Sequence, residues 1–99
     1  MTAKEPSGGP EVVLRLYVAG NSPNSLQARA NLETLCRLRD ETFRIEIVDA
    51  LEEPLRLLKD RIPATPALVK VSPSPTVRIL GTLVDHDEVL TLLGLLKNA

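Results

Sequence analysis

Residues 12–25 read VVLRLYVAGNSPNS and join a strand to a turn. The first seven residues are rich in β-branched side chains and carry a single charge, which is typical of a largely buried strand. Gly20 and the three residues after it then turn the chain. Ser22 or Asn21 can cap a following helix that starts at Pro23, where a missing N–H costs nothing. The stretch therefore predicts a strand that turns directly into a helix.

The pattern continues on the carboxyl side of this stretch. The helix is expected to run to about residue 39, with an apolar side facing a sheet and made by Ala28, Leu32, Leu35 and Cys36. Residues 43–48 alternate apolar and charged side chains, as a second strand does. A short helix is expected from Glu53-Pro54, with Leu55, Leu58 and Ile62 on its apolar side.

The last third of the chain supplies two more strands and a helix. Pro66 is expected at the start of a third strand, because proline cannot donate within a sheet. A connector, SPSP at residues 72–75, leads into a fourth strand over 76–80, close enough for a hairpin. Asp85 to Glu88 open a final helix, with an apolar stripe of Val89, Leu92, Leu93 and Leu96.

This order, βαβαββα, predicts an α/β, thioredoxin-like fold with a central mixed sheet. We expect a single domain over residues 12–97, preceded by a flexible arm over 1–11 that is rich in proline and glycine.

The composition of the chain argues against nucleic-acid binding and against a membrane-spanning segment. Lysine and arginine number 12 against 13 acidic residues, and the only aromatic residues are Tyr17 and Phe43, so nucleic acid is a poor partner. The apolar run over 89–96 is far shorter than the ~20 residues of a membrane span. A lone cysteine and the charged first residues, which are unlike a signal peptide, fit a soluble protein of the reducing cytoplasm.

The residues that could carry chemistry give little support for an enzyme. Redox-active thioredoxin folds hold two cysteines at the start of the first helix, where this chain has Asn21-Ser22-Pro23-Asn24. Cys36 is expected on a buried helix face as a small apolar residue. His86 lies among acids at a helix start, which explains it without a metal. We therefore predict no catalytic residues, no metal and no cofactor.

Thr65-Pro66 is the most informative pair, because thioredoxin-like domains carry a cis-proline immediately before the third strand, and X-Pro bonds readily adopt cis. A trans turn proline is the alternative. With a cis bond, this segment would face the start of the first helix. The predicted partner-binding residues are then Asn21, Ser22, Asn24 and Ser25 together with Ala64, Thr65 and Pro66.

Several of these motifs resemble the KaiB family. Residues 14–25 are similar to the opening strand and turn of KaiB proteins, which read close to LYVAGNTPNS. The similarity continues in order through IVDAL at 47–51 with Pro54, then ATP at 64–66, the connector with Pro73 and Pro75, and RILG at 78–81. It covers nearly everything from residue 12 to residue 96.

The resemblance implies a protein that binds KaiC, a hexameric clock ATPase, and helps to sequester KaiA or competes with a sensor histidine kinase. It also implies two folds: a thioredoxin-like monomer that binds KaiC, and a resting homo-oligomer, dimer or tetramer, whose C-terminal half pairs differently. Leu92, where the family often has glycine, and Ser74 between the two prolines leave room for a KaiB-like stress-response adaptor without a clock role.

The sequence itself permits two shapes near its end. As a helix, the stripe named above lines one face; as a strand, Leu90, Leu92, Gly94 and Leu96 line one side. A glycine inside a helix is unfavourable by roughly 1 kcal/mol relative to alanine, so replacing Gly94 by alanine is predicted to favour the helical form. The predicted switch hinge spans 63–81, and the residues assigned to the switch are Pro63, Pro66, Pro73, Pro75, Gly81 and Gly94.

Two functions from other classes stay open on sequence alone. One is a thioredoxin-superfamily oxidoreductase that uses Cys36. The other is an oligomeric scaffold with no ATPase partner. The helix pattern of the last segment and the absence of a dithiol favour the thioredoxin-like binding protein.

Overall fold

The computed structural model describes residues 11–95. In this range the elements follow the predicted βαβαββα order. The predicted arm otherwise lies outside the described residues, but Glu11 already belongs to the first strand. The elements are β1 (Glu11–Val18), α1 (Pro23–Arg37), β2 (Thr42–Asp49), α2 (Pro54–Lys59), β3 (Ala67–Ser72), β4 (Val77–Leu80) and α3 (His86–Leu92).

The described strands form one mixed sheet in the order β2-β1-β3-β4. β1 and β2 run parallel, with Arg15 opposite Glu46 and Tyr17 opposite Val48. β3 runs antiparallel to β1 and to β4, so β3 and β4 form the predicted hairpin. The fold class predicted from the sequence is confirmed, and the chain takes the thioredoxin-like arrangement.

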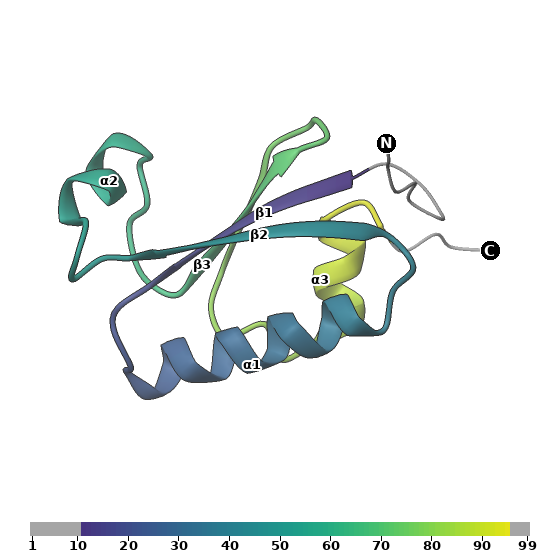
Figure 1. The fold of residues 1–99 in the computed structure, drawn as a ribbon, viewed down its shortest axis with the longest axis horizontal. Coiled ribbons are helices and arrows are strands. Elements are labelled where there is room, and N and C mark those ends of the chain that lie inside the picture. Colours follow the sequence, from purple (N-terminus) through teal and green to yellow (C-terminus); the bar gives the residue numbers. More distant parts are fainter. Residues whose placement is uncertain (1–10, 96–99) are drawn as a thin grey trace, which may run out of the picture.

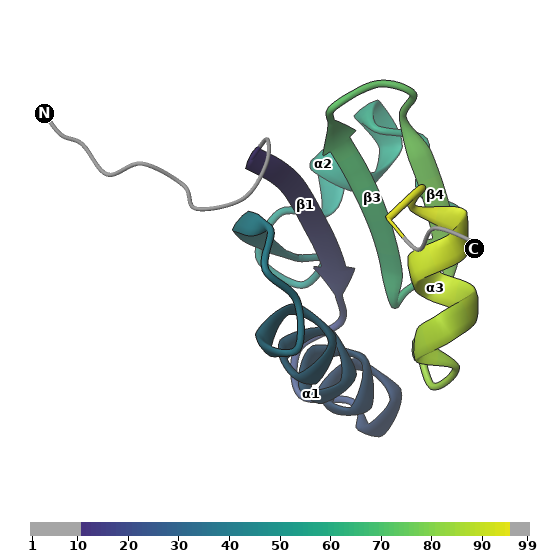
Figure 2. The ribbon, with the colours of Figure 1, turned by 90° about the vertical axis from the view of Figure 1, so that its right-hand side faces the viewer.

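The three helices divide unequally between the two faces of the sheet. Figure 1 shows α1 and α3 beneath the sheet, while the short α2 lies at the other side, near one end. Figure 2, seen end-on, shows α3 against the β3–β4 side and α1 below β1. We call the face covered by α1 and α3 the helix-covered face, and the opposite one the α2 face.

Alternation along the strands places the main core on the helix-covered face. Leu14 and Leu16 of β1 are fully buried there, as is Leu68 of β3. The helix residues predicted to face the sheet largely do so, since Ala28, Leu32 and Leu35 are buried. The rest of this core consists of Val12, Val18, Leu83, Val89, Leu90 and Leu93.

One cation lies on this apolar face. Lys70 of β3 is 4% exposed, and its Nζ donates to the carbonyl oxygen of Leu93 at 2.9 Å. Because the last carbonyls of a helix have no partner within the helix, the ammonium satisfies one of them and joins β3 to the end of α3.

The predicted apolar side of α2 is wrong for Leu55 and Leu58, although Ile62 is buried as expected. Leu55 and Leu58 are each 75% exposed, while Leu57 and Ile62 pack against Tyr17 and its neighbours on the α2 face. The helix has only six residues, and the chain leaves it with Arg61 in the left-handed region, φ 60°. The helical spacing that placed Leu55, Leu58 and Ile62 on one side therefore does not apply, because Ile62 lies beyond the end of the helix.

The end of α3 also differs from the prediction. The helix ends at Leu92, and Gly94 follows it with φ 78°. The N–H of Leu95 donates to the carbonyl of Leu90 at 2.8 Å, the bond that closes a helix end around a left-handed glycine. Gly94 therefore terminates the helix, and the predicted penalty inside the helix does not arise.

The apolar stripe of α3 shifts accordingly. Leu90 is buried with Val89 and Leu93, whereas Leu92 is 49% exposed. Leu96 lies outside the described residues. No helix between residues 11 and 95 is long and apolar enough to span a membrane.

Candidate protein-binding surface

The turn from β1 to α1 is held by two serines. Ser22 caps α1, since its Oγ accepts from the Ser25 N–H, and Pro23 takes the first helical position as predicted. The Ser25 hydroxyl is fully buried, accepting from the Ala19 N–H at 2.9 Å and from the Ser22 hydroxyl at 2.8 Å. Ser25 therefore supports the turn from inside.

Asp49 joins this turn to the one that follows β2. Its carboxylate accepts from the backbone N–H groups of Leu51 and Gly20, both at 2.9 Å. These two hydrogen bonds hold the pKa of Asp49 below its ordinary value. Gly20 has φ 54°, and a Cβ there would meet the Leu51 side chain at 2.8 Å. The ends of the two parallel strands are thus fixed side by side.

The segment before β3 ends at the same edge of the sheet. Tyr17 lies opposite Ala67, so Pro66 follows on beside the end of β1. The Thr65-Pro66 bond is cis, as predicted, and the Pro66 carbonyl accepts from the Gly81 N–H at 3.0 Å. We call this edge, with residues 19–25, 49–55 and 64–66, the carboxyl-edge surface.

The predicted partner-binding residues are not equally accessible on this surface. Asn21, Asn24 and Ala64 are exposed, while Ser22 and Thr65 are partly buried. Ser25 and Pro66 are buried. The last two can shape the surface but offer little area to a partner.

Sequence reasoning missed the apolar part of this end of the molecule. Leu51 is 72% exposed, matching the exposure of Leu55 and Leu58 on α2. Exposed leucines grouped on one short segment mark an interaction site more often than single ones do. The sequence pattern placed Leu55 and Leu58 on the apolar side of the short helix and assigned no surface role to Leu51.

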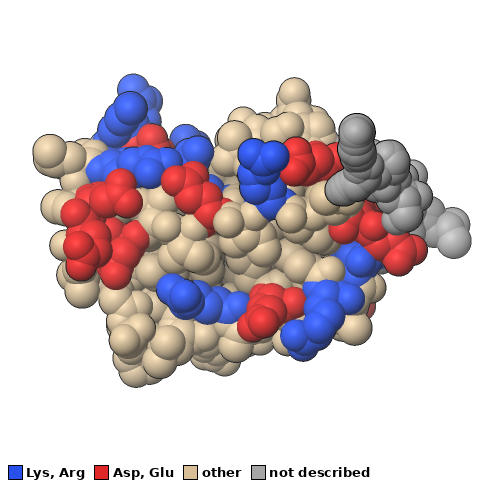
Figure 3. Space-filling model, in the orientation of Figure 1, with Lys and Arg blue, Asp and Glu red and all other residues tan. Residues whose placement is uncertain are grey.

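Charged residues anchor α2 to the sheet. Arg56 of α2 pairs with Glu46 at 3.1 Å and approaches Asp60 at 3.6 Å, while Arg15 pairs with Glu46 at 2.7 Å. The Tyr17 hydroxyl donates to Asp60, and this bond, with the nearby arginines, lowers the pKa of that carboxylate. Hydrogen bonds from Arg15 and Arg56 likewise lower the pKa of Glu46. Figure 3 shows charged side chains gathered over α2, and none over the first turn of α1.

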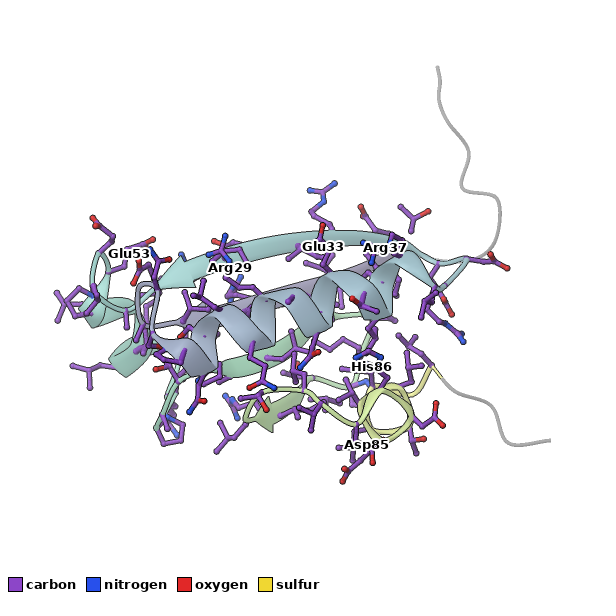
Figure 4. The ribbon with its side chains drawn as sticks, turned by 90° about the horizontal axis from the view of Figure 1, so that it is seen from below. Arg29, Glu33, Arg37, Glu53, Asp85 and His86 are labelled. Carbon is purple, nitrogen blue, oxygen red and sulfur yellow. The ribbon has the colours of Figure 1, made fainter. Side chains whose placement is uncertain are left out.

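The residues considered for catalysis or metal binding do not come together in one site. Cys36 is half-buried rather than fully buried, and burial raises the pKa of its thiol to about 11. Figure 4 shows Asp85 and His86 projecting from different sides of the start of α3, and Asp85 caps that helix through the Glu88 N–H. No group of three or more potential metal-ligating side chains occurs among residues 11–95.

The remaining switch residues lie at element boundaries. Pro63, Pro73 and Pro75 are exposed, and the bonds before Pro73 and Pro75 are cis. Gly81 ends β4 with φ 113°.

The geometry defines a class: a thioredoxin-like domain whose usual redox position holds two asparagines, a serine and a proline. Solved structures bear out the fold. The N-terminal domain of Synechococcus elongatus SasA superposes with a TM-score of 0.73 at 17% identity, covering 100% of this chain and 98% of that one. Chloroplastic thioredoxin z superposes with a TM-score of 0.71 at 18% identity, and the match covers 85% of this chain and 76% of that one.

Sequence comparison identifies the family. The KaiB domain model matches residues 15–95. The circadian clock protein KaiB3 of Synechocystis sp. is 44% identical over 86 residues, which cover 85% of this chain and 81% of the relative. The circadian clock oscillator protein KaiB of Microcystis aeruginosa is 44% identical over 88 residues, with coverage of 85% and 82%. The chain belongs to the KaiB family.

Proposed function

We propose that this protein is a non-catalytic clock or signalling component that binds a KaiC-type ATPase ring through its carboxyl-edge surface. KaiA or a histidine kinase is the second partner in this proposal. The observation that carries it is the pairing of KaiB-family membership with exposed leucines and asparagines at the edge where thioredoxin folds hold their dithiol.

The construction of the surface supports binding rather than chemistry. Asp49 and Ser25 fix the turns by hydrogen bonds to backbone, so the exposed side chains project from a rigid base. Rigid loops lose less conformational entropy when a partner orders them. Leu51 and Leu55 supply apolar area, and Asn21 and Asn24 supply hydrogen-bonding groups.

The oxidoreductase alternative finds little support in the surroundings of Cys36. With a thiol pKa of about 11, the reactive thiolate makes up only about one part in ten thousand at pH 7. An insulin-reduction assay with glutathione tests this directly. Turnover that disappears in Cys36→Ser would establish the enzyme and contradict a binding-only role.

Binding is tested by interferometry with the full chain and the KaiC homologue of the same organism, with ATP present. Asn24→Glu places a charge in the uncharged part of the surface and is expected to weaken binding about tenfold, as a desolvated charge does. Leu55→Ser removes exposed apolar area and should also weaken it.

Thr42→Glu is the matched control, because it adds the same charge on an exposed residue at the start of β2, at the end of the sheet away from the carboxyl-edge surface and outside the predicted hinge. It should leave affinity unchanged. If the parent chain does not bind the homologue, the proposed partner is wrong. If neither Asn24→Glu nor Leu55→Ser changes the affinity, the carboxyl-edge surface is not the site.

A further inference from the structure

The α2 face contains a groove that the proposed binding surface does not use. Its volume is about 470 Å³, and it lies between the end of α2 and the strands β1, β3 and β4. Val69 and Val71 of β3 contribute its apolar lining. Its polar lining consists of Arg15, Tyr17, Lys59, Asp60, Arg61, Thr76 and Arg78.

The charges of this groove are unbalanced. Four cationic side chains line it against one carboxylate, that of Asp60. Asp60 is already engaged by the Tyr17 hydroxyl, and Arg15 and Arg56 lie within 3.8 and 3.6 Å of it. Arg15 is itself paired with Glu46.

None of the other three cations forms an ion pair with a carboxylate within the described residues, although Lys59 acts on the Asp60 carboxylate at longer range. Arg78 donates to the backbone carbonyl of Asp60 at 3.4 Å, and neither Lys59 nor Arg61 forms an ion pair in that range. All three are exposed. They leave a net positive charge directed into the groove.

The backbone at Arg61 adds an independent observation. Arg61 directly follows the α2 cap with φ 60°, and the Ile62 N–H closes the helix end on the Leu57 carbonyl at 2.9 Å. Glycine is the usual residue at this position, because it alone adopts the left-handed region freely. An arginine is held here in an unfavourable backbone conformation, and it is one of the residues that line the groove.

We propose that this groove binds a small molecule carrying two or more phosphate groups. The negative charge of such a ligand complements the three cations that form no ion pair. Guanidinium groups bind phosphate oxygens through paired N–H donors. The Thr76 hydroxyl is a further donor in the lining. The groove has no exposed aromatic ring, because Tyr17 is 1% exposed, so recognition falls on the phosphates rather than on a base.

The test is an NMR titration of the full chain with inorganic tripolyphosphate at constant ionic strength. Saturable shifts are expected at the amides of residues 59–61 and 76–78. Arg78→Gln should weaken binding about tenfold through loss of a charge-assisted contact. Arg61→Gly should weaken it similarly, while the chain stays folded, because glycine suits φ 60°.

Arg37→Gln is the matched control, since Arg37 is exposed at the end of α1 and is absent from the groove lining. It should leave the affinity unchanged. ATP is titrated in parallel and is expected to shift the same amides. Shifts that follow ionic strength alone, or equal weakening by Arg37→Gln, would overturn the proposal.

A titration with a poly-glutamate peptide is the last part of the experiment. If the peptide causes saturable shifts of these amide signals while tripolyphosphate and ATP do not, the groove binds an acidic protein segment and the phosphate proposal is wrong. None of these readouts uses the ATPase, so the outcome is separate from that of the proposed function.

Discussion

The two faces of the sheet come from the same strands but are built from different kinds of residue. On the helix-covered face, Leu14, Leu16 and Leu68 are completely buried beneath α1 and α3. On the α2 face, the neighbouring positions hold Arg15, Tyr17 and Arg78, and only a six-residue helix covers part of them.

The difference shows how a 99-residue chain can hold its fold on one face and leave charged and apolar side chains exposed on the other. Buried apolar area supplies most of the folding free energy, so the helix-covered face holds the domain together. Exposed ion pairs contribute little to stability, so the α2 face can carry unpaired cations and exposed leucines at small cost. Three changes test how complete this separation is.

The largest effect is expected for Leu16→Ala on the helix-covered face. Leu16 is fully buried, and removing its methyl groups should leave a cavity and lower the free energy of unfolding by about 2–5 kcal/mol. Leu55→Ala removes the same atoms from a side chain that is 75% exposed and should change stability by less than about 0.5 kcal/mol. Urea denaturation measures both, and similar losses would show that α2 also supports the fold.

An intermediate effect is expected for Gly94→Ala, opposite in sign to the prediction from sequence. At φ 78°, alanine is disfavoured by about 1 kcal/mol or more, although its Cβ would lie at an ordinary 3.9 Å from the Lys70 Nζ. The thioredoxin-like form should become less stable, and Gly94→Asn should lose less because asparagine tolerates this region.

NMR extends the same test to fold switching. If the chain exchanges slowly between two folds, the thioredoxin-like set of peaks should shrink in Gly94→Ala. Growth of that set would mean that Gly94 lies inside a helix in solution and would restore the prediction made from sequence.

The smallest effect concerns pH and the α2 face. The pKa of Asp60 lies below its ordinary value of 3.8 because the Tyr17 hydroxyl and nearby arginines stabilise its charged form. A lowered pKa in the folded state adds stability above the ordinary value, and this stability is lost as the pH falls through the folded-state pKa. Parent chain and Asp60→Asn should therefore differ by less than about 1 kcal/mol at pH 6, and the difference should shrink as the pH falls through the folded-state pKa of Asp60.

Denaturation at a series of pH values measures this difference. Asp40→Asn, a change to an exposed carboxylate just after α1, is the control. If the parent chain and Asp60→Asn still differ in unfolding free energy at the lowest pH, the contribution of Asp60 comes from packing rather than from charge.

The sequence by itself determined the order of elements, the mixed thioredoxin-like sheet and the cap at Asp85, and it narrowed the α1 cap to Asn21 or Ser22; the structure then selected Ser22 and the cis form of the Thr65-Pro66 bond. The features determined by sequence follow from local rules: alternation in strands, capping hydroxyls and carboxylates, and the position of proline before a strand. Its motifs also pointed to the KaiB family, which the domain match over 15–95 shows.

Only the tertiary structure decided which leucines are buried and where the short helices end. Leu55 and Leu58 have a spacing that suits a buried stripe, but α2 is anchored by Arg56 and by Leu57, which turns those leucines outward. Gly94 ends α3 in the left-handed region, and only the fold brings Lys70, 24 positions earlier, to the Leu93 carbonyl at that end. Periodicity records which residues share a side, whereas the choice of the side that packs depends on contacts between residues far apart in the chain.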